Sequence, residues 1–502
     1  MKKIKCATYE GLDAKVVDVE LTLTRGLPSF SIVGMASMAI TEAKERIKSA
    51  LLSNEYTFPP KRITTLLAPS ELAKSGSQFD LCMALMILLY DDAKDFDEWF
   101  VFGELGLDGL VKENTQLYPL ILSLANQKLI NKAIVPKSSL EKLSKIPGVA
   151  FYGVESLQEA KEVLTDESAQ PSVTCNDINY PSFEIAKEKY YYVKEYKEDF
   201  HDVKGQEVAK RAALIAAVGL HNIILEGSPG CGKSMIANRL RYILPSMSEA
   251  EVLDMAKLQT LEGQEVDFKP HRPFKNPHHS ATSASIFGGG SHKAKIGEVG
   301  LANNGILFFD ELPHFSKNVL EALREPMQDN KIKISRVNSK IEYPANFLFV
   351  GAMNPCPCGN LLDPNKECRC NELEIQRYKN RLSDPFLDRI DLYVAMQQVD
   401  GNDKSSISSK EMHKVVLESQ IFAKQRGQRS FNGKMCDEEI EQFCVMESDA
   451  KDVLEMATRQ FNLSFRGIKK VQKVARTIAD IAQSDMIQKE HILEALSYRR
   501  RS

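Results

Sequence analysis

The sequence has no hydrophobic run long enough to span a membrane and no strong excess of charge of either sign. Its longest apolar run, LCMALMILLY at residues 81–90, has half of the roughly 20 residues that a membrane-spanning helix needs. The first residues, MKKIKCATYEG, lack the apolar core of a signal peptide. We therefore expect a cytoplasmic protein. Because the formal charge is −3, any contact with nucleic acid must come from a local basic patch.

Internal repeats and low-complexity tracts are also lacking, and the length predicts about two to four domains. The strand and helix patterns predict that the fold class is α/β. Residues 1–165 combine a half-buried strand pattern with an amphipathic helix, which indicates an α/β domain. Residues 166–200 are polar, charged and rich in Tyr, as in a linker or a strap over the next domain. Residues 201–403 alternate apolar runs with helical patterns, as a parallel sheet requires. Residues 404–502 show only helical patterns and predict a helical bundle.

The segment HNIILEGSPGCGKSMIANRL, at residues 221–240, is typical of a phosphate-binding P-loop. An apolar strand leads into the pattern G-x-x-x-x-G-K-S, and a helical pattern follows. In such a loop backbone N–H groups surround phosphate oxygens, Lys233 reaches the β and γ phosphates, and Ser234 offers its hydroxyl to Mg²⁺. The alternative is a glycine-rich turn that binds nothing. The predicted ATP-binding residues are Gly227, Ser228, Pro229, Gly230, Cys231, Gly232, Lys233 and Ser234.

A second motif, NNGILFFDELPHF at residues 303–315, carries two acids at the end of an apolar strand. Acids at the carboxyl end of a strand lie beside the P-loop in an open α/β sheet. Asp310 is predicted to hold Mg²⁺ through water, and Glu311 to polarise the attacking water. A lone Asp-Glu pair after a strand is usually surface charge. Its position about 75 residues after the P-loop predicts an ATPase instead.

Three further polar residues are candidates for sensing the nucleotide. Asn354 follows another apolar strand and is expected near the γ-phosphate, unless it is simply a turn residue. Arg389, in PFLDRIDLYV, either forms an ion pair within the chain or reaches the ATP of a neighbouring subunit. Such an arginine finger contributes ~10³ to 10⁵ in rate. Arg466 begins an amphipathic helix pattern and is a candidate second sensor, with a solvated helix face as the alternative.

Four of the ten cysteines lie in MNPCPCGNLLDPNKECRC, at residues 353–370. A disulfide is disfavoured by the expected cytosolic location and by the strain of a Cys-x-Cys ring. A redox switch normally uses one activated thiol rather than two symmetric pairs. Four thiolates around Zn²⁺ fit best, because structural zinc sites take four cysteines, and reduced, unliganded thiols are the alternative. The predicted zinc ligands are Cys356, Cys358, Cys368 and Cys370.

Together these motifs resemble the AAA+ ATPases, specifically the magnesium-chelatase-like branch that includes the ComM/YifB proteins. The resemblance covers essentially the whole chain. Besides the motifs above, it is carried by DVKGQEVAKRAALIAAVGLHN (202–222), RPFKNPHHSAT (272–282), RYKNRLSDPFLDRIDL (377–392) and VARTIADI. It implies a hexameric, ATP-hydrolysing motor on DNA, linked to branch migration in homologous recombination and natural transformation. Arg389 matches the family's arginine finger and Arg466 its second sensor.

Within the same branch, a chelatase-type motor subunit that remodels a protein partner without touching DNA is the alternative function. The segment KIKISRVNSKIEYP, at residues 331–344, resembles a hairpin that this branch inserts before the first sensor. In related helicases such hairpins point into the pore of the ring. The resemblance therefore implies DNA contacts by Lys333, Arg336 and Lys340, and a plain exposed hairpin is the alternative.

Residues 102–147 resemble the second half of the Lon protease domain. A Lon-type enzyme needs a nucleophilic Ser activated by a Lys. In our alignment Gln78 stands at the Ser position and Tyr118 at the Lys position. A slip of one residue would restore Ser77 but not the missing Lys. We predict a fold retained without proteolysis and used for binding or assembly, which disfavours a peptidase-associated unfoldase.

The predicted organisation is a Lon-protease-like α/β domain (1–165), a linker (166–200), an AAA+ core (201–403) with a four-cysteine insertion (354–371), and a C-terminal helical lid (404–502). The expected cofactors are ATP, Mg²⁺ and Zn²⁺. The expected partners are five further copies of the chain, DNA, and a protein bound through the N-terminal domain, with no membrane contact.

Overall fold

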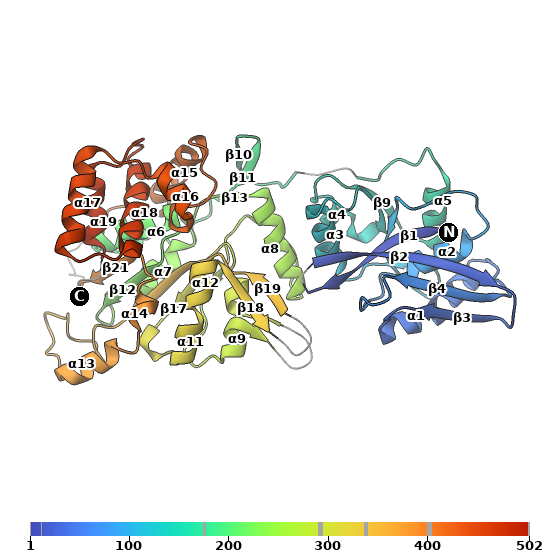
Figure 1. Cartoon of the computed structure of the whole chain (residues 1–502), viewed down its shortest axis with the longest axis horizontal. Helices are drawn as coiled ribbons and strands as arrows, with labels where there is room; N and C mark the ends of the chain where they lie inside the picture. Colours follow the sequence, from blue (N-terminus) through green and yellow to red (C-terminus); the bar gives the residue numbers. More distant parts are fainter. Residues whose placement is uncertain are drawn as a thin grey trace. The chain divides into compact units, whose positions relative to one another are not determined.

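The structure is a computed structural model that describes residues 2–11, 13–173, 177–289, 295–335, 340–398 and 404–499 (Figure 1). It divides into two compact units. The first comprises Met1–Asn179, Val252–Phe268 and Val337–Ile341, and the second comprises Tyr180–Glu251, Lys269–Arg336 and Glu342–Ser502. Both units combine helices with sheets that contain parallel strands, which confirms the predicted α/β fold class.

The first unit is built on a seven-stranded sheet with the order β3-β4-β2-β1-β5-β8-β9. Strand β2 pairs antiparallel with β1 and β4, and the other pairs are parallel. The strands are β1 (Lys3–Glu10), β2 (Asp13–Thr24), β3 (Ser29–Val33), β4 (Arg62–Ala68), β5 (Phe100–Val101), β8 (Lys132–Pro136) and β9 (Ala150–Val154), with a separate pair β6 (Glu104–Leu105) and β7 (Val111–Lys112). The helices are α1 (Met38–Ser53), α2 (Asp80–Leu88), α3 (Leu117–Asn126), α4 (Leu140–Leu143) and α5 (Leu157–Thr165), with the 3₁₀ turn η1 (Lys137–Ser139).

Helix α2 shows what the longest apolar run of the sequence does in the fold. It contains most of that run, and its residues from Asp80 to Ile87 are all buried. A helix that is apolar on every side must be covered on every side. The run is therefore the central helix of this unit. Among the described residues, no helix has both the length and the apolar character needed to cross a bilayer.

The second unit is built on a five-stranded sheet with the order β14-β17-β20-β12-β21, in which every pair is parallel. Its strands are β14 (Phe274–Lys275), β17 (Ile306–Phe309), β20 (Leu348–Met353), β12 (Ile223–Gly227) and β21 (Leu392–Met396). Helices between or beside the strands are α6 (Glu207–Gly219), α7 (Lys233–Leu240), α8 (Glu249–Leu261, which continues into the first unit), α9 (Ser283–Phe287), α10 (Glu298–Leu301), α11 (Lys317–Ala322), α12 (Arg324–Asp329), α13 (Glu372–Lys379) and α14 (Asp384–Leu387), with the 3₁₀ turns η2 (Phe200–Asp202) and η3 (Leu312–His314).

Two hydrophobic cores cover the two faces of this sheet. Side chains alternate between them along each strand, so that Ile223 and Leu225 join one core and Ile224 joins the other. The first core also contains α6, α7 and the C-terminal helices, whereas the second contains α9 to α12 and α14. The helices drawn in red in Figure 1 thus share a core with the sheet face that carries Ile223 and Leu225. They are α15 (Ser409–Gln425), α16 (Asp437–Phe443), α17 (Ser448–Gln460), α18 (Phe465–Ile481) and α19 (Lys489–Ser497), with the 3₁₀ turn η4 (Asn432–Lys434).

Of the remaining small sheets among the described residues, two lie in the second unit, and a third has a strand, β19, that begins in the first unit. A hairpin of β10 (Ser182–Ile185) and β11 (Glu188–Tyr191) pairs with β13 (Met247–Ser248). This hairpin is formed by part of the segment predicted as a linker or strap. The other two are the hairpins β15 (Gly288–Gly289) with β16 (Lys295–Ile296) and β18 (Lys331–Ser335) with β19 (Lys340–Pro344).

Candidate functional site

Three neighbouring strands of the parallel sheet bring the predicted site residues to one edge. β12 runs into the P-loop, β17 ends just before Asp310 and Glu311, and β20 ends just before Asn354. β20 lies between β12 and β17, and all three strands are parallel. Their carboxyl ends therefore meet, which is where ligands bind in open α/β sheets.

The P-loop places Lys233 inside its own turn. Gly230 and Gly232 have φ angles of 85° and 96°, a region that favours glycine. The Lys233 Nζ donates to the carbonyl oxygens of Gly227 (2.6 Å) and Ser228 (3.0 Å) and to Oδ1 of Asn354 (3.2 Å). Burial lowers the pKa of Lys233, while Cys231 and Asp310 oppose that shift. The ammonium group thus lies where the loop can present it to an anion.

Ser234 and Asp310 form the second contact across this edge. The Ser234 Oγ donates to Oδ2 of Asp310 at 3.0 Å. A hydroxyl and a carboxylate are the oxygen ligands that Mg²⁺ takes in nucleotide sites, and both remain partly accessible, so these residues fit the predicted ion. Glu311, the next residue, has its backbone N–H bound to Asp310 Oδ1 (2.9 Å), and its side chain is 58% exposed.

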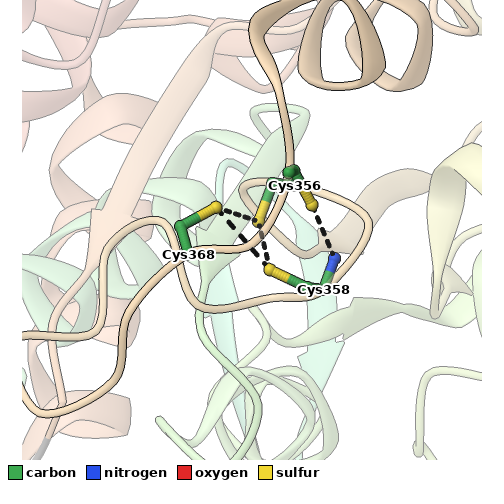
Figure 2. A group of neighbouring side chains, drawn as sticks. Cys356, Cys358 and Cys368 are labelled. Atoms are coloured by element: carbon green, nitrogen blue, oxygen red, sulfur yellow. Dashed lines mark hydrogen bonds between the residues drawn. The ribbon is translucent and has the colours of Figure 1, made fainter.

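The four clustered cysteines converge, as Figure 2 shows for Cys356, Cys358 and Cys368. The Sγ atom of Cys356 lies 3.4 Å from that of Cys358 and 3.7 Å from that of Cys368, and the Cys358–Cys368 distance is 3.6 Å. All four sulfurs, including that of Cys370, lie within 4.8 Å of one another. Zn–S bonds of about 2.3 Å at tetrahedral angles place sulfurs about 3.8 Å apart. The donor set and its spacing therefore fit a tetrahedral metal ion.

Backbone groups favour the charged form of one of these thiols. The N–H groups of Asn360 and Arg369 lower the pKa of Cys358 to about 6, and the other thiols contribute to the shift. By contrast, a backbone hydrogen bond from Cys358 lowers the pKa of Cys370, but burial and the neighbouring thiols outweigh it and raise this pKa to about 12. Four thiols this close cannot all be ionised without a cation between them.

The cysteine loop lies directly against the P-loop. Gly359, with φ of 81°, packs so closely that an added Cβ would lie 2.7 Å from Cδ of Pro229. Gln398 also joins the two segments, because its Nε2 donates to the carbonyl of Pro229 (3.5 Å) and to Oδ2 of Asp363 (3.1 Å). The insertion therefore shares a packing surface with the nucleotide loop.

The two predicted arginines lie away from this edge. The Arg389 Nε donates to the carbonyl of Arg324 (3.0 Å), and its Nη2 donates to Oε1 of Gln328 (2.7 Å). These partners are carbonyl and amide oxygens rather than carboxylates. Arg466 is exposed and lines a cavity of about 480 Å³ together with Asp388. The cavity is lined by residues from 384–393 and 464–499, and so does not include the P-loop of the same chain.

The predicted DNA-contacting residues are only partly described. Lys333 is exposed on β18. Arg336 and the side chain of Lys340 lie outside the described residues.

In the first unit, the two residues aligned with the protease positions are buried. Gln78 is 4% exposed, and its Nε2 donates to the carbonyls of Ala7 (3.2 Å) and Ser75 (2.9 Å). Tyr118 is 3% exposed, and its hydroxyl donates to the carbonyl of Leu253 (3.4 Å). Burial raises the pKa of Tyr118.

The hydroxyl of Ser77, by contrast, faces polar side chains. It donates to Oε2 of Glu104 and accepts from Nδ2 of Asn114 (3.2 Å). A carboxylate and an amide bind this serine, and neither is the lysine that a Lon-type mechanism requires.

Sequence reasoning missed the histidines near Glu311. His279 Nδ1 lies 3.5 Å from Oε2 of Glu311. Its ring is 4.2 Å from that of His278 and 6.0 Å from that of His314, measured between centroids. The signal was present, because RPFKNPHHSAT places two adjacent histidines just after a strand and forms part of the family resemblance.

Comparisons with known proteins agree with this architecture along the chain. The family described as magnesium chelatase, subunit ChlI, matches residues 199–404. Subunit ChlI of Mg-chelatase matches residues 19–139, and the C-terminal family of the same subunit matches residues 406–499.

Two relatives match this chain over nearly its whole length. The chain is 36% identical to "Competence protein ComM" of Haemophilus influenzae over 501 residues, which cover 97% of this chain and 95% of the relative. It is also 36% identical to "Uncharacterized protein YifB" of Escherichia coli over 500 residues, with the same coverage. The chain is 26% identical to the "Magnesium-chelatase 67 kDa subunit" of Heliobacterium mobile, over 30% of this chain. The chain therefore belongs to the ComM/YifB family of magnesium-chelatase-like AAA+ proteins.

Proposed function

We propose that this chain hydrolyses ATP as a hexameric motor that acts on DNA. One observation carries the ATPase part of the proposal. Lys233, Ser234, Asp310, Glu311 and Asn354 come from three separate strand ends and converge at one edge of the parallel sheet.

Each of these side chains has a separate task in phosphoryl transfer. Lys233 would bind the β and γ phosphates, and Ser234 and Asp310 would hold Mg²⁺. When bound, Mg²⁺ would neutralise the negative charge that develops on the phosphate oxygens. Glu311 orients the attacking water and accepts its proton. Asn354 accepts a hydrogen bond from Lys233. When the Lys233 ammonium turns toward the γ-phosphate, Asn354 would bind that phosphate too.

The proposed hexamer supplies what a single chain lacks. Arg389 and Arg466 both lie away from the P-loop of their own chain. The pKa of Arg389 is lowered first by burial, then by the positive charge of Arg324, and then by that of Arg466. Two cations in one region provide a site for the terminal phosphate of a nucleotide held by the next subunit. We therefore assign Arg389 as the arginine finger and Arg466 as the second sensor of the neighbouring site.

We also propose that Cys356, Cys358, Cys368 and Cys370 hold one structural Zn²⁺. Support comes from the near-tetrahedral spacing of the sulfurs. A loop of this length has little core of its own, and a metal site fixes such a loop. Here it fixes the surface that packs on Pro229.

DNA is the proposed substrate because of the family and because Lys333, on β18, is exposed. The Haemophilus influenzae relative is named for competence, and we propose a related role in branch migration during homologous recombination and natural transformation. Lys333, Arg336 and Lys340 would supply the phosphate contacts. We place this activity in the cytoplasm and assign the N-terminal unit to partner binding or assembly rather than to proteolysis.

The proposal is tested by ATP hydrolysis with and without DNA. The purified chain is assayed alone, with a linear duplex, and with a four-way junction of matched length and total nucleotide concentration. Stimulation by the junction above the duplex is expected. Lys233→Ala serves as the hydrolysis-dead control, and Lys333→Ala should weaken stimulation without changing hydrolysis in the absence of DNA. Hydrolysis that no DNA changes would contradict the DNA part and favour the chelatase-type motor acting on a protein.

A further inference from the structure

A cavity of about 750 Å³ lies in the second unit. It is lined by the hairpin β10–β11, β13, the first turn of α8, α15, η4, and the loop that joins α15 to η4 (Figure 1). Two asparagines that flank the hairpin β18–β19 complete the lining. No residue of the P-loop, 227–234, is among these described lining residues. Clefts of about 300–1,000 Å³ hold small-molecule ligands, so this cavity has the size of a separate ligand site.

The charged side chains of the cavity favour an anion. The lining contains three basic and two acidic residues: Lys424, Arg429, Lys434, Glu188 and Glu251. The charge of Glu251 is already balanced by Arg272, which lies outside the lining and whose Nη1 is 3.0 Å from Oε1 of Glu251. Glu188 accepts a hydrogen bond from the hydroxyl of Tyr190. The basic residues therefore leave an excess of positive charge in the cavity, which attracts a negatively charged ligand.

The two lysines have N–H groups to offer such a ligand. The Lys424 Nζ donates to the carbonyl of Arg429 (2.6 Å), and the Lys434 Nζ donates to the carbonyl of Phe347 (2.8 Å). An ammonium group has three N–H donors, so two donors of each lysine have no hydrogen-bond acceptor in the described part of the chain. Burial lowers the pKa of Lys434 to about 8 and also lowers the pKa of Lys424. A bound anion would favour the charged form of both lysines.

Two asparagines add hydrogen-bond acceptors to the same cavity. The Oδ1 atoms of Asn330 and Asn346 are buried and have no hydrogen-bond partner among the described residues. Asn330 directly precedes β18, and Asn346 lies shortly after β19. A buried acceptor without a partner is costly, so a ligand that donates hydroxyl groups to these oxygens would gain affinity. The cavity thus combines donors for an anion with acceptors for hydroxyl groups.

We propose that this cavity binds a sugar phosphate, either free or as the ribose 5′-phosphate part of a nucleotide. The phosphate accepts hydrogen bonds from Lys424 and Lys434, and the sugar hydroxyls donate to Asn330 and Asn346. A phosphate fits better than a carboxylate, because it carries up to two negative charges and three strong acceptor oxygens. Binding here uses no residue of the P-loop and needs no ATP hydrolysis.

The test is a calorimetric titration of the full chain with ribose 5-phosphate, inorganic phosphate and AMP. Ribose 5-phosphate should bind about tenfold more tightly than inorganic phosphate, which lacks the sugar hydroxyls. Lys424→Met keeps the apolar stem but removes the charge, and it should weaken binding of ribose 5-phosphate by about 10- to 100-fold. Lys414→Met is the matched control, because Lys414 lies on the same helix α15 but outside the cavity. Its affinity should equal that of the unchanged chain.

Asn346→Ala separates ligand binding from a structural role. The Asn346 Oδ1 has no partner to lose among the described residues, so thermal stability should stay the same or rise. Affinity for ribose 5-phosphate should still fall by about tenfold. Binding of AMP that is tighter than that of ribose 5-phosphate, and weakened by Asn346→Ala, would identify a nucleotide as the source. AMP that binds no more tightly would identify a free sugar phosphate.

Four results would overturn the proposal. They are no binding of ribose 5-phosphate, equal affinities for ribose 5-phosphate and inorganic phosphate, unchanged affinity in Lys424→Met or Asn346→Ala, and loss of binding in Lys233→Ala. The last would place the ligand in the P-loop, whereas a ligand in the proposed cavity should bind Lys233→Ala and the unchanged chain equally well.

Discussion

Each unit contains polar side chains at the predicted site positions, and the two groups of side chains differ in what their polar atoms contact. In the first unit, Gln78 and Tyr118 are buried, and both donate to backbone carbonyls. At the sheet edge of the second unit, Ser234 and Asp310 bind each other while remaining partly accessible, and Glu311 is exposed. In the first arrangement the polar groups bind the backbone, whereas in the second they remain accessible from outside.

This difference separates side chains that stabilise the fold from side chains that are accessible to a ligand. A buried donor that loses its partner costs about 1–3 kcal/mol, so side chains bound to the backbone become part of the stability of the domain. Accessible groups at strand ends contribute less to stability, and their side chains can contact a ligand. The comparison predicts large effects on turnover at the sheet edge and almost none at the buried pair.

The largest expected effect is at Arg389, whose proposed ligand lies in another subunit. Arg389→Ala should lower turnover by about 10³-fold or more while leaving ATP affinity nearly unchanged. Mixing this variant with Lys233→Ala protein should restore part of the activity, because each brings one intact half of a shared site. The measurement is the hydrolysis rate as a function of mixing ratio. Absence of rescue at every ratio would place Arg389 in an intrachain role.

Glu311→Gln should have the next largest effect. It should keep ATP binding, since Lys233 and Ser234 are unchanged, and should lower turnover by about 10² to 10⁴ because the amide cannot accept a proton from water. Nucleotide binding and single-turnover hydrolysis measure the two parts separately. Glu325→Gln, on the neighbouring helix α12, is a control for the loss of one charge. Equal rates in Glu311→Gln and the unchanged chain would remove Glu311 from the base position.

The zinc proposal gives the third effect, on metal content rather than turnover. Protein purified without chelator should contain about one zinc per chain, and Cys368→Ser should reduce this sharply because one of four thiolates is lost. Cys436→Ser is the matched control, since Cys436 is exposed and lies outside the cluster. Elemental analysis provides the measurement. Folded, active protein without zinc would refute the assignment.

A smaller effect is expected where the cysteine loop touches the P-loop. Gly359→Ala places a Cβ 2.7 Å from Pro229 and should weaken ATP binding by about tenfold, on the order of 1 kcal/mol of strain. Gly427→Ala shares a positive φ of 83° but has open space around its Cβ. Both variants should lose some thermal stability, and only the first should lose ATP affinity in a titration. Equal affinities would show that the loop does not affect the nucleotide site.

Features encoded in short segments could be predicted from the sequence. One apolar strand is followed by GSPGCGKS and another by Asp310 and Glu311, and both lie in the parallel sheet. The predicted α/β class is confirmed. The half-buried strand pattern within residues 1–165 is VVDVELTLT (16–24), and it lies in strand β2. In each case the signal and the structure lie within the same few residues.

Features that depend on distant partners could not be predicted. The hairpin β10–β11 is polar and rich in Tyr, and it pairs with β13 about 55 residues away. His279 meets Glu311 only because β14 and β17 are neighbours in the sheet. The position of Arg466 depends on how the C-terminal helices pack on the back of that sheet. Local pattern carries no information about these tertiary choices.

The smallest expected effect is on proteolysis. Gln78→Ser should yield no peptidase, with or without ATP, because a serine there would still lack a base. Tyr118 is buried, burial raises the pKa of its hydroxyl, and that hydroxyl donates to Leu253. It therefore stays protonated at neutral pH and cannot act as a desolvated Lys does. The measurement is release of fluorescent peptides from labelled casein by the unchanged chain, by Gln78→Ser, and by Ser77→Ala. ATP-dependent cleavage by the unchanged chain that Ser77→Ala abolishes would show that Ser77 and Glu104 form a working site, and that the two clusters do not differ as proposed.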